Sequence, residues 1–374
     1  MIVLTGRQGA RTESGERRLL MFGSNDYLGL AGDPAVVHGG IAALERYGTG
    51  LAMNQPFATT PLHEALRERI ADFTGTEAAL LFGSCTTANI ALLTTLAGTL
   101  DAVVLSDADN HASIIDGCRL ARGRTIVYRT RDLVDLRDQV AATRASPNRT
   151  VVSDGVFSVE GDVADGAELA RIARQAGASL VLDDSHAAGV IGARGRGTAE
   201  ACGLDARTDV AAVTGTFAKA FGAGGGGYVA GSATFMAEVK RAARFYIFST
   251  GMHVAAVGAA LIGVDRATTD IERLERLRAN VLRLRTRLIA SGFTLLGGGA
   301  SPITPILIGD EEQARRLSLC LAQRGLVAPV MTFPIVPQGA ARLRLQPSAC
   351  HDEADIDLAC EILAEEATAV GLFA

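Results

Sequence analysis

Lysine and tryptophan are the residues that this sequence has least of. Tryptophan is absent, and of the 36 lysines and arginines only Lys219 and Lys240 are lysines. Arginine keeps its proton in proteins, whereas a lysine removed from water can lose it and act as a nucleophile or base. Lys219 lies in the uncharged segment TGTFAKAFGAGGGG (214–227). Composition alone leaves two roles open for it, a surface lysine and a lysine that forms a Schiff base.

Several other absences limit the function classes. The six cysteines include no C-x-x-C pair and the six histidines are dispersed, which predicts reduced thiols and no metal centre. The net charge of −5 does not predict a nucleic-acid partner. The apolar run 254–264 is too short to span a bilayer, and the amino terminus has no signal-peptide pattern. These features predict a cytoplasmic protein with neither nucleic-acid nor membrane partners.

Short apolar runs alternate with amphipathic segments along the first 231 residues. One such segment, 62–73, is predicted to be a helix that is capped by Thr60, begins at Pro61 and ends at Gly75. Strands that alternate with helices predict an α/β fold with a largely parallel sheet covered by helices on both faces. The expected strands are 78–82, 102–106, 125–129, 150–153, 179–184, 209–215 and 227–231.

The pattern changes after residue 231. Long helices are expected to about residue 291, including the amphipathic, arginine-rich 273–288, whose charged side is predicted to face solvent. Further strands are predicted at 303–309, 326–330 and 341–346, before a helix at 353–370. We therefore predict an N-terminal segment (1–47), a large domain (48–265), and a long joining helix with a smaller C-terminal α/β domain (266–374).

Polar residues cluster where predicted strands end. Each could be a cap or a satisfied core residue, but ligands of open parallel sheets bind beyond the carboxyl ends of strands, so together they predict a site there. Asp184 is predicted to be a structural neighbour of that site and not a catalytic acid. The other polar residues at these strand ends are His111, Asp154, Ser158, Asp183, His186 and Lys219.

Two glycine-rich places could hold a phosphate. Gly222, Gly224 and Gly227 form G-x-G-x-x-G, but a strand and not a helix is expected to follow, so we reject a dinucleotide site. In LLFGSCTTANIALL a strand and a Gly-Ser turn precede a helix, whose first N–H groups, at Cys85 and Thr86, would point at an anion. A phosphate cradle, a Schiff-base lysine and a strand-end aspartate together indicate pyridoxal 5'-phosphate (PLP).

Long motifs then match a known family in order and character. They run from SNDYLGL (24–30) to RLRLQPSACH (342–351) and include DADNHASIIDGCRL, SDGVFSVEGD, LDDSHAAGVIGARGRG and TGTFAKAFG. Over nearly its whole length the chain resembles the α-oxoamine synthases, which are fold type I PLP-dependent transferases. It is most similar to the branch of 2-amino-3-ketobutyrate CoA ligase and 8-amino-7-oxononanoate synthase. The resemblance implies a large domain with a mostly parallel sheet and a smaller C-terminal α/β domain.

The resemblance also implies roles for individual residues around the PLP ring. Lys219 would form the Schiff base and carry the substrate Cα proton, and Asp183 would pair with the pyridine nitrogen. His186 would hydrogen-bond the phenolic oxygen, with Ser158 nearby, and His111 would stack on the ring.

The phosphate and the substrate carboxylate have their own expected ligands by the same resemblance. The phosphate would be held by Ser84, Cys85, Thr86 and Thr216, and by Ser249 reaching over from a partner subunit in a homodimer with shared active sites. Asn25 and Arg344 would bind the amino-acid carboxylate. Arg342 is the alternative to Arg344, because alternate residues of a strand face opposite sides.

The implied reaction condenses an amino acid of the glycine, alanine or serine class with an acyl thioester, giving an α-amino-β-keto acid or an α-aminoketone. Segment 48–63 departs from the family pattern, since Asn54 and Ala58 stand where arginine and glycine are expected. The amino acid, the acyl chain and the choice between CoA and an acyl carrier protein therefore stay open. The alternatives are an aminotransferase or aldol-cleaving lyase of the same fold, and a PLP-holding scaffold without activity.

Overall fold

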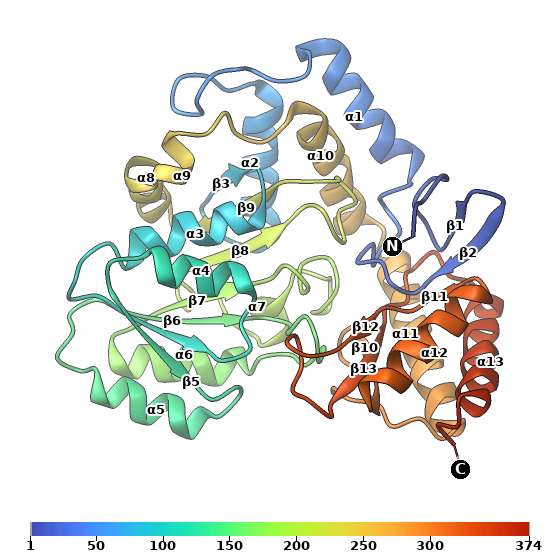
Figure 1. The fold of residues 1–374 in the computed structure, drawn as a ribbon. Coiled ribbons are helices and arrows are strands. Elements are labelled where there is room, and N and C mark those ends of the chain that lie inside the picture. The colour runs from blue at the N-terminus through green and yellow to red at the C-terminus, as the bar shows by residue number, and fades with distance from the viewer. Residues whose placement is uncertain (1, 374) are drawn as a thin grey trace. The chain divides into compact units, whose positions relative to one another are not determined.

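The computed structural model describes residues 2–373, which form two compact units (Figure 1). The large unit comprises Pro34–Phe157 and Val163–Thr269, and the small unit comprises the residues up to Asp33, Ser158–Asp162 and those from Asp270 onward. Compact units within one chain do not by themselves define independently folding domains. The domain boundaries expected from the sequence therefore stay predictions.

A seven-stranded sheet forms the centre of the large unit. Its strands are β3 (Ala78–Phe82), β4 (Val103–Asp107), β5 (Arg124–Tyr128), β6 (Arg149–Asp154), β7 (Ser179–Asp183), β8 (Ala212–Thr216) and β9 (Gly227–Gly231). They lie in the order β3-β9-β8-β7-β6-β4-β5, in which only β9 runs antiparallel to its neighbours. The α/β class with a largely parallel sheet is thus confirmed.

Helices cover this sheet on both faces. They are α1 (Pro34–Tyr47), α2 (Pro61–Thr74), α3 (Cys85–Leu96), α4 (Ala112–Leu120), α5 (Leu133–Ala142), α6 (Gly166–Ala176), α7 (Thr198–Ala201), α8 (Ala233–Ala242), α9 (Arg244–Ile247) and α10 (Val254–Thr269). Figure 1 shows α3 and α4 on one side of the sheet and α5 and α6 on the other. This follows from right-handed crossovers, because the chain moves in one direction from β4 to β5 and in the opposite direction from β5 through β6 to β7.

The ends of α2 agree with the signals in the sequence. The Thr60 side chain accepts a hydrogen bond from the backbone N–H of His63. Gly75 ends the helix with φ +73°, in the left-handed region that favours glycine. Local sequence therefore decides where this helix begins and ends.

The small unit contains two three-stranded sheets. Their strands are β1 (Arg11–Ser14), β2 (Arg17–Met21), β10 (Thr304–Gly309), β11 (Leu326–Val327), β12 (Val330–Met331) and β13 (Ala341–Leu345), in the orders β1-β2-β11 and β10-β13-β12. The hairpin of β1 and β2 was not predicted, because its sequence RTESGERR is polar and lacks the apolar alternation of a half-buried strand.

The prediction of one strand at 326–330 is wrong. The structure divides it into β11, which pairs with β2, and β12, which pairs with β13. Pro329 lies between them, and proline has no N–H with which to continue a ladder. Its carbonyl instead accepts a hydrogen bond from the backbone of Arg344 at 2.8 Å.

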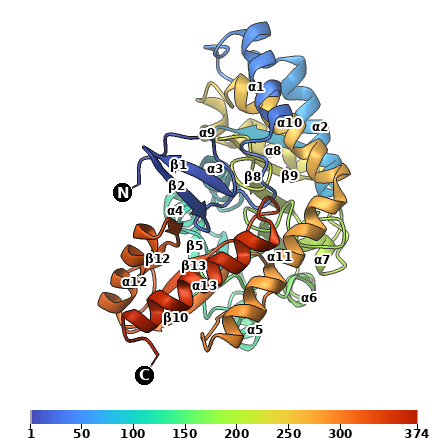
Figure 2. The same cartoon turned by 90° about the vertical axis from the view of Figure 1, so that its right-hand side faces the viewer.

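Three helices complete the small unit, α11 (Ile271–Ala290), α12 (Glu311–Gln323) and α13 (Glu353–Ala369), and Figure 2 shows them beside the sheet of β10, β12 and β13. Leu274, Leu277, Val281, Leu284 and Leu288 of α11 are buried, as the helical spacing predicts. The arginines of α11 are not all solvated.

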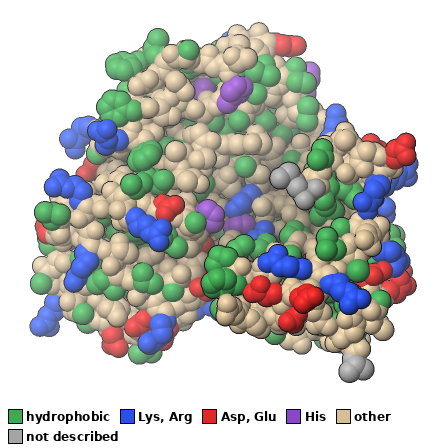
Figure 3. Space-filling model, in the orientation of Figure 1, with side chains coloured by type: hydrophobic (Ala, Val, Ile, Leu, Met, Phe, Trp, Pro, Cys, Tyr) green, Lys and Arg blue, Asp and Glu red, His purple; other side chains and the backbone are tan. Residues whose placement is uncertain are grey.

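Arginines of α11 instead form ion pairs with α13. Arg283 lies 2.7 Å from Asp357 and 2.8 Å from Glu353, and Arg287 lies 3.0 Å from Asp357. On the face drawn in Figure 3, basic and acidic side chains are interspersed and not gathered by sign. None of the helices within residues 2–373 combines the length and the apolar character that crossing a bilayer needs.

Leu92 tests the packing of α3 on the sheet. It is fully buried in the core that also contains Phe82, Val104 and Val229, so Leu92→Ala should leave a cavity and lower the free energy of unfolding by about 2–5 kcal/mol. Leu100 is 76% exposed, and Leu100→Ala should change stability by no more than about 0.5 kcal/mol. Denaturant titrations of both variants check this, and equal effects would contradict the assigned core.

Candidate active site

A cavity of about 200 Å³ lies in the large unit where β3, β6, β7 and β8 end. Its position agrees with the rule that ligands bind beyond the carboxyl ends of parallel strands. Eight residues singled out from the sequence line it, namely Ser84, Cys85, Thr86, His111, Asp183, His186, Thr216 and Lys219. The tertiary structure therefore brings together residues that are spread over more than a hundred positions of the chain.

Lys219 and His186 are in direct contact. Nζ of Lys219 lies 2.8 Å from Nε2 of His186, and both side chains line the cavity. The loop that carries Lys219 is anchored by Phe217 and Phe221, which are fully buried on either side of the lysine. Because the ammonium group can only donate, Nε2 of His186 accepts this hydrogen bond, and the contact holds Nζ in place.

Asp183 is the buried carboxylate at the end of β7, with 3% of its surface exposed. It accepts a hydrogen bond from Nδ2 of Asn89 at 2.6 Å and another from the backbone N–H of Ser185 at 2.9 Å. The Cys85 sulfur lies 3.9 Å from each carboxylate oxygen. These donors fix the position of the carboxylate, which could pair with a cationic group of a ligand in the cavity.

The amino terminus of α3 offers backbone donors to the same cavity. Ser84 caps the helix and accepts a hydrogen bond from the backbone N–H of Thr87. The first-turn N–H groups of Cys85 and Thr86 have no partner within the helix, since the i−4 carbonyls that they would need lie before its start. A Cβ on Gly227 would lie 2.4 Å from the Cys85 nitrogen, so only glycine lets β9 approach this helix end.

The hydroxyl of Thr216, which the resemblance implies as a phosphate ligand, already has two hydrogen-bond partners within the protein. Its hydroxyl donates to the carbonyl of Gly226 at 3.1 Å and accepts from the backbone N–H of Ala218 at 3.2 Å. The hydroxyl can still contact an anion if it releases the Gly226 carbonyl. The backbone at Cys85 and Thr86 is therefore the better-prepared part of the anion site.

His111 caps α4 and forms part of the cavity wall. Its backbone N–H donates to a carboxylate oxygen of Asp154 at 3.1 Å, and its Nδ1 contacts the Ser113 hydroxyl at 2.8 Å. Partial removal of the ring from water lowers the pKa of His111. Burial raises the pKa of Asp154 well above its usual range, and the nearby charge of Asp183 adds to this effect.

Asn89, Ser113 and Asp154 were not predicted as site residues. Asp154 was noted only as a polar residue at a strand end. Ser113 follows His111 by two residues, and Asn89 is the one carboxamide of the otherwise apolar or hydroxyl-bearing helix α3. A buried carboxamide requires hydrogen-bond partners, and that requirement is the signal that could have identified Asn89.

A second polar cluster lies in the small unit. Arg344 donates to the carbonyl of Ser158 at 2.7 Å and to the side-chain oxygens of Asn25 and Gln346, each at 3.0 Å. Its Nε is buried without a hydrogen-bond partner among residues 2–373, and burial lowers the pKa of Arg344. Ser158 belongs to this cluster through its backbone.

Arg342 and Arg344 differ in their partners. Arg342 is buried and forms an ion pair with Glu160, whereas no ion pair of Arg344 is found within the described part of the chain. A buried guanidinium without a counter-ion can take a carboxylate from a ligand. Arg344 as the carboxylate ligand stays a prediction.

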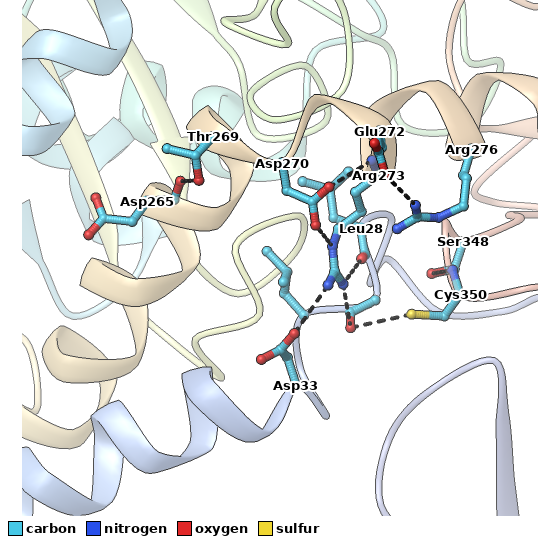
Figure 4. Close-up of polar contacts among 12 residues, drawn as sticks. Leu28, Asp33, Asp265, Thr269, Asp270, Glu272, Arg273, Arg276, Ser348 and Cys350 are labelled. Atoms are coloured by element: carbon cyan, nitrogen blue, oxygen red, sulfur yellow. Dashed lines mark hydrogen bonds and ion pairs between the residues drawn. The ribbon is translucent and has the colours of Figure 1, made fainter.

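The loop that carries Asn25 is fixed by α11 and by the turn after β13. Arg273 donates to the carbonyl of Leu28 at 2.9 Å and lies 3.2 Å from the carboxylate of Asp33 (Figure 4). Gly29 has φ +65°, and a Cβ there would lie 1.9 Å from the Cys350 sulfur. Asn25 therefore sits on a rigid loop.

Ser249 does not line the cavity of its own chain. Its carbonyl accepts from the backbone N–H of Gln55 at 3.1 Å, and its hydroxyl accepts from that of Gly251 at 3.2 Å. Asn54, the residue that departs from the family pattern, donates to the carbonyl of Ile247 at 3.0 Å. These bonds attach the unusual segment 48–63 to the segment that carries Ser249.

Within residues 2–373 no three His, Cys, Asp or Glu side chains gather in a way that could hold a metal ion. The donors present suit an organic ligand with an anionic end instead, because the cavity joins a helix amino terminus to a buried carboxylate and a lysine.

Comparisons with known proteins bear on this arrangement. A family model described as aminotransferase class I and II matches residues 17–363. The 8-amino-7-oxononanoate synthase of Geobacter sulfurreducens is 38% identical over 99% of this chain and 94% of its own length. The mitochondrial 2-amino-3-ketobutyrate coenzyme A ligase of Bos taurus is 37% identical over 97% of this chain and 86% of its own. A serine palmitoyltransferase from S. paucimobilis with a bound PLP–myriocin aldimine matches with a TM-score of 0.95, 30% identity and coverage of 100% and 94%.

Asp184 has a structural role that pH can reveal. It is 2% exposed and accepts a hydrogen bond from the backbone N–H of Thr198 at 3.0 Å. Burial, with a contribution from the charge of Asp183, raises the pKa of Asp184 to about 7. The folded chain therefore keeps this proton up to about pH 7, whereas the unfolded chain loses it near pH 4.

Between these pH values the folded state binds more protons than the unfolded state. The contribution of Asp184 to the free energy of unfolding should therefore fall by up to about 4 kcal/mol as the pH rises from 4 to 7. Asp184→Asn keeps an acceptor for Thr198 and should become more stable relative to wild type over this interval. Denaturant titrations at pH 5 and pH 8 measure the difference, with Asp116→Asn on the exposed side of α4 as the control. Parallel pH profiles of wild type and Asp184→Asn would refute the effect.

Proposed function

This chain belongs to the aminotransferase class I and II family, and from this membership and its cavity we propose that it is a PLP-dependent α-oxoamine synthase. In this function it condenses an amino acid with an acyl thioester. The observation that carries the proposal is the contact of Lys219 with His186 beside the buried carboxylate of Asp183. The relatives named as a synthase, a coenzyme A ligase and a palmitoyltransferase support the same reaction class.

The residues of the cavity fit the three reactive ends of PLP. Lys219 is the amine for its aldehyde, Asp183 is the anion for its pyridine nitrogen, and the N–H groups of Cys85 and Thr86 are donors for its phosphate. His186 and His111 border the same space. When bound, PLP supplies an electron sink for negative charge that develops at the substrate Cα.

Lys219 is the residue we propose as proton carrier at the substrate Cα. Its Nζ is held within the cavity by His186, and a primary amine on a half-buried side chain can accept and return a proton. Asp183 supports this step with a fixed carboxylate, whose oxygens accept from Asn89 and from the Ser185 backbone.

Arg344 and Asn25 are proposed to bind the substrate carboxylate. Arg344 has a buried Nε without a partner, and its Nη2 already lies 3.0 Å from Asn25. A carboxylate would satisfy the guanidinium through two parallel hydrogen bonds. Glycine, alanine and serine all carry this group, so the amino acid within that class is decided by other contacts.

A homodimer is the second part of the proposal. Ser249 lies outside its own cavity, and we propose that it contributes its hydroxyl to the phosphate site of the partner subunit. Asn54 would then affect the donor site indirectly, because it holds the segment around Ile247. The thioester donor is either a CoA ester or an acyl carrier protein.

A thiol-release assay tests the function. The protein is saturated with PLP and given one amino acid with one acyl thioester from panels of each, and free thiol is measured. Thiol release that requires both substrates supports the synthase. Conversion of PLP to its amine form by the amino acid, with release of the matching keto acid and without a thioester, would instead identify an aminotransferase. Aldol cleavage without a thioester would identify a lyase.

Lys219→Ala should bind PLP without covalent attachment and should lose thiol release by roughly 100-fold or more, because the proton carrier is gone. Borohydride reduction followed by peptide mapping locates the attachment in wild type. Lys240, on the exposed side of α8, provides the control, and Lys240→Ala should retain both properties. Undiminished turnover of Lys219→Ala would overturn the assignment.

Arg344→Gln should raise the KM for the amino acid by about 10- to 100-fold, because the substrate carboxylate loses at least one charge-assisted hydrogen bond. The KM for the thioester should change little. Arg324→Gln, on the exposed surface, is the matched control. A rise in both KM values together would indicate a folding defect and would contradict a specific carboxylate site.

A further inference from the structure

A chain of hydrogen bonds links the carboxylate of Asp183 to the imidazole of His111. Nδ2 of Asn89 lies 2.6 Å from Oδ2 of Asp183 and 2.9 Å from Oγ of Ser113. The same Ser113 hydroxyl lies 2.8 Å from Nδ1 of His111. Asn89 comes from α3 and Ser113 from the first turn of α4, and both are buried, with 2% and 3% of their surface exposed.

The donor and the acceptor of each of these hydrogen bonds can be assigned. A carboxylate only accepts, so Asn89 must turn its NH₂ group toward Asp183, and its second hydrogen goes to Ser113. The Ser113 oxygen thus receives a hydrogen bond and has one hydrogen left to donate. Among the residues that the structure describes, Nδ1 of His111 is the acceptor found for that hydrogen.

The backbone gives the same result independently. The N–H of Ser113 donates to Nδ1 of His111 at 3.2 Å, as the capping interaction that starts α4. A peptide N–H cannot accept, so Nδ1 must carry a lone pair and no hydrogen. Two donors therefore converge on Nδ1, and the ring hydrogen of the neutral imidazole belongs on Nε2.

We propose that Asn89 and Ser113 are positioning residues, which hold His111 as a neutral imidazole with its hydrogen on Nε2, so that it enters the cavity as a hydrogen-bond donor and not as a base. No hydrogen bond of Nε2 is found among residues 2–373, and this nitrogen remains for a ligand. The chemical class of that ligand is an oxygen acceptor, such as a carbonyl or carboxylate.

The charges around His111 are compatible with a neutral imidazole that carries its hydrogen on Nε2. Asp183 on β7 favours imidazolium, whereas Lys219 after β8 opposes it, and Asp154 on β6 contacts only the backbone N–H. His111 keeps exposed surface, but partial desolvation of its ring lowers the pKa of His111. Imidazolium would require a hydrogen on Nδ1, where it would meet the hydrogens of both donors.

The consequence for catalysis rests on the proposed function. In a synthase, the proton at the substrate Cα would be left to Lys219, and His111 would donate from Nε2 to an oxygen of a bound substrate. Asn89 has a second effect, since the NH₂ group that donates to Ser113 also donates to the carboxylate of Asp183.

Nitrogen NMR of the protein labelled with ¹⁵N-histidine tests the proposal without any turnover. Nδ1 of His111 should give a pyridine-like signal and Nε2 a pyrrole-like signal near neutral pH, in the protein both without and with PLP. Comparison with His111→Gln assigns these signals among the six histidines. A pyrrole-like Nδ1 in wild type would overturn the proposal.

Ser113→Ala removes one of the two donors to Nδ1. The Nδ1–H form should become populated, and the midpoint of imidazole protonation should rise by roughly 0.5 to 1 pH unit, the equivalent of one hydrogen bond. Ser113→Thr keeps the hydroxyl and should restore the wild-type signals. Asn89→Ala leaves the Ser113 hydroxyl without its donor and should shift the midpoint in the same direction by less.

Ser106 provides a matched control. It is equally buried, with 2% of its surface exposed, and its hydroxyl accepts from Nδ2 of Asn110 at 2.9 Å, as Ser113 accepts from Asn89. Ser106→Ala should therefore cost similar stability and leave the His111 signals unchanged. Unchanged signals in Ser113→Ala, or an equal change in Ser106→Ala, would show that these residues only pack α3 and α4, and would overturn the proposal. Because the NMR signals need no substrate, this failure is distinguishable from the absence of thiol release.

Discussion

The buried negative charge of Asp183 is the constraint around which the large unit arranges its polar groups. An isolated carboxylate inside a protein is costly unless donors and a positive charge surround it. Asn89 and the Ser185 backbone supply donors, and Lys219 supplies a positive charge within the same cavity. The order of the strands makes this possible, because β6, β7 and β8 are neighbours and their carboxyl ends meet at one edge.

Close approach of two backbone segments shapes the part of the cavity at the start of α3. Gly227 lets β9 lie against the first turn of α3, where a side chain would meet the Cys85 nitrogen at 2.4 Å. The Ser84 cap satisfies the N–H of Thr87, and the earlier N–H groups remain for an anion. A lysine, a buried carboxylate and a helix amino terminus thus share a cavity of about 200 Å³, an arrangement that suits an elongated ligand with an anionic end.

No residue of segment 48–63 is among those that line the cavity. Asn54 bonds to Ile247 and Gln55 to Ser249, so the segment is attached to a stretch that lies outside the cavity lining of its own chain. The two positions that depart from the expected pattern, Asn54 and Ala58, therefore lie outside the residues that line the cavity.

The sequence by itself determined the α/β class, the strands of the large sheet and the ends of α2, and it singled out Lys219, Asp183, His186 and His111, which line one cavity, because periodicity, caps and motifs are local properties. Only the tertiary structure decided the division of 326–330 at Pro329, the ion pair of Arg342 with Glu160, and the hydrogen bonds that join Asn89 to Ser113 and Asp183. Each of these depends on which donor meets which acceptor between segments far apart in the chain. Such pairing follows from the packing of strands and helices, and no local pattern records it.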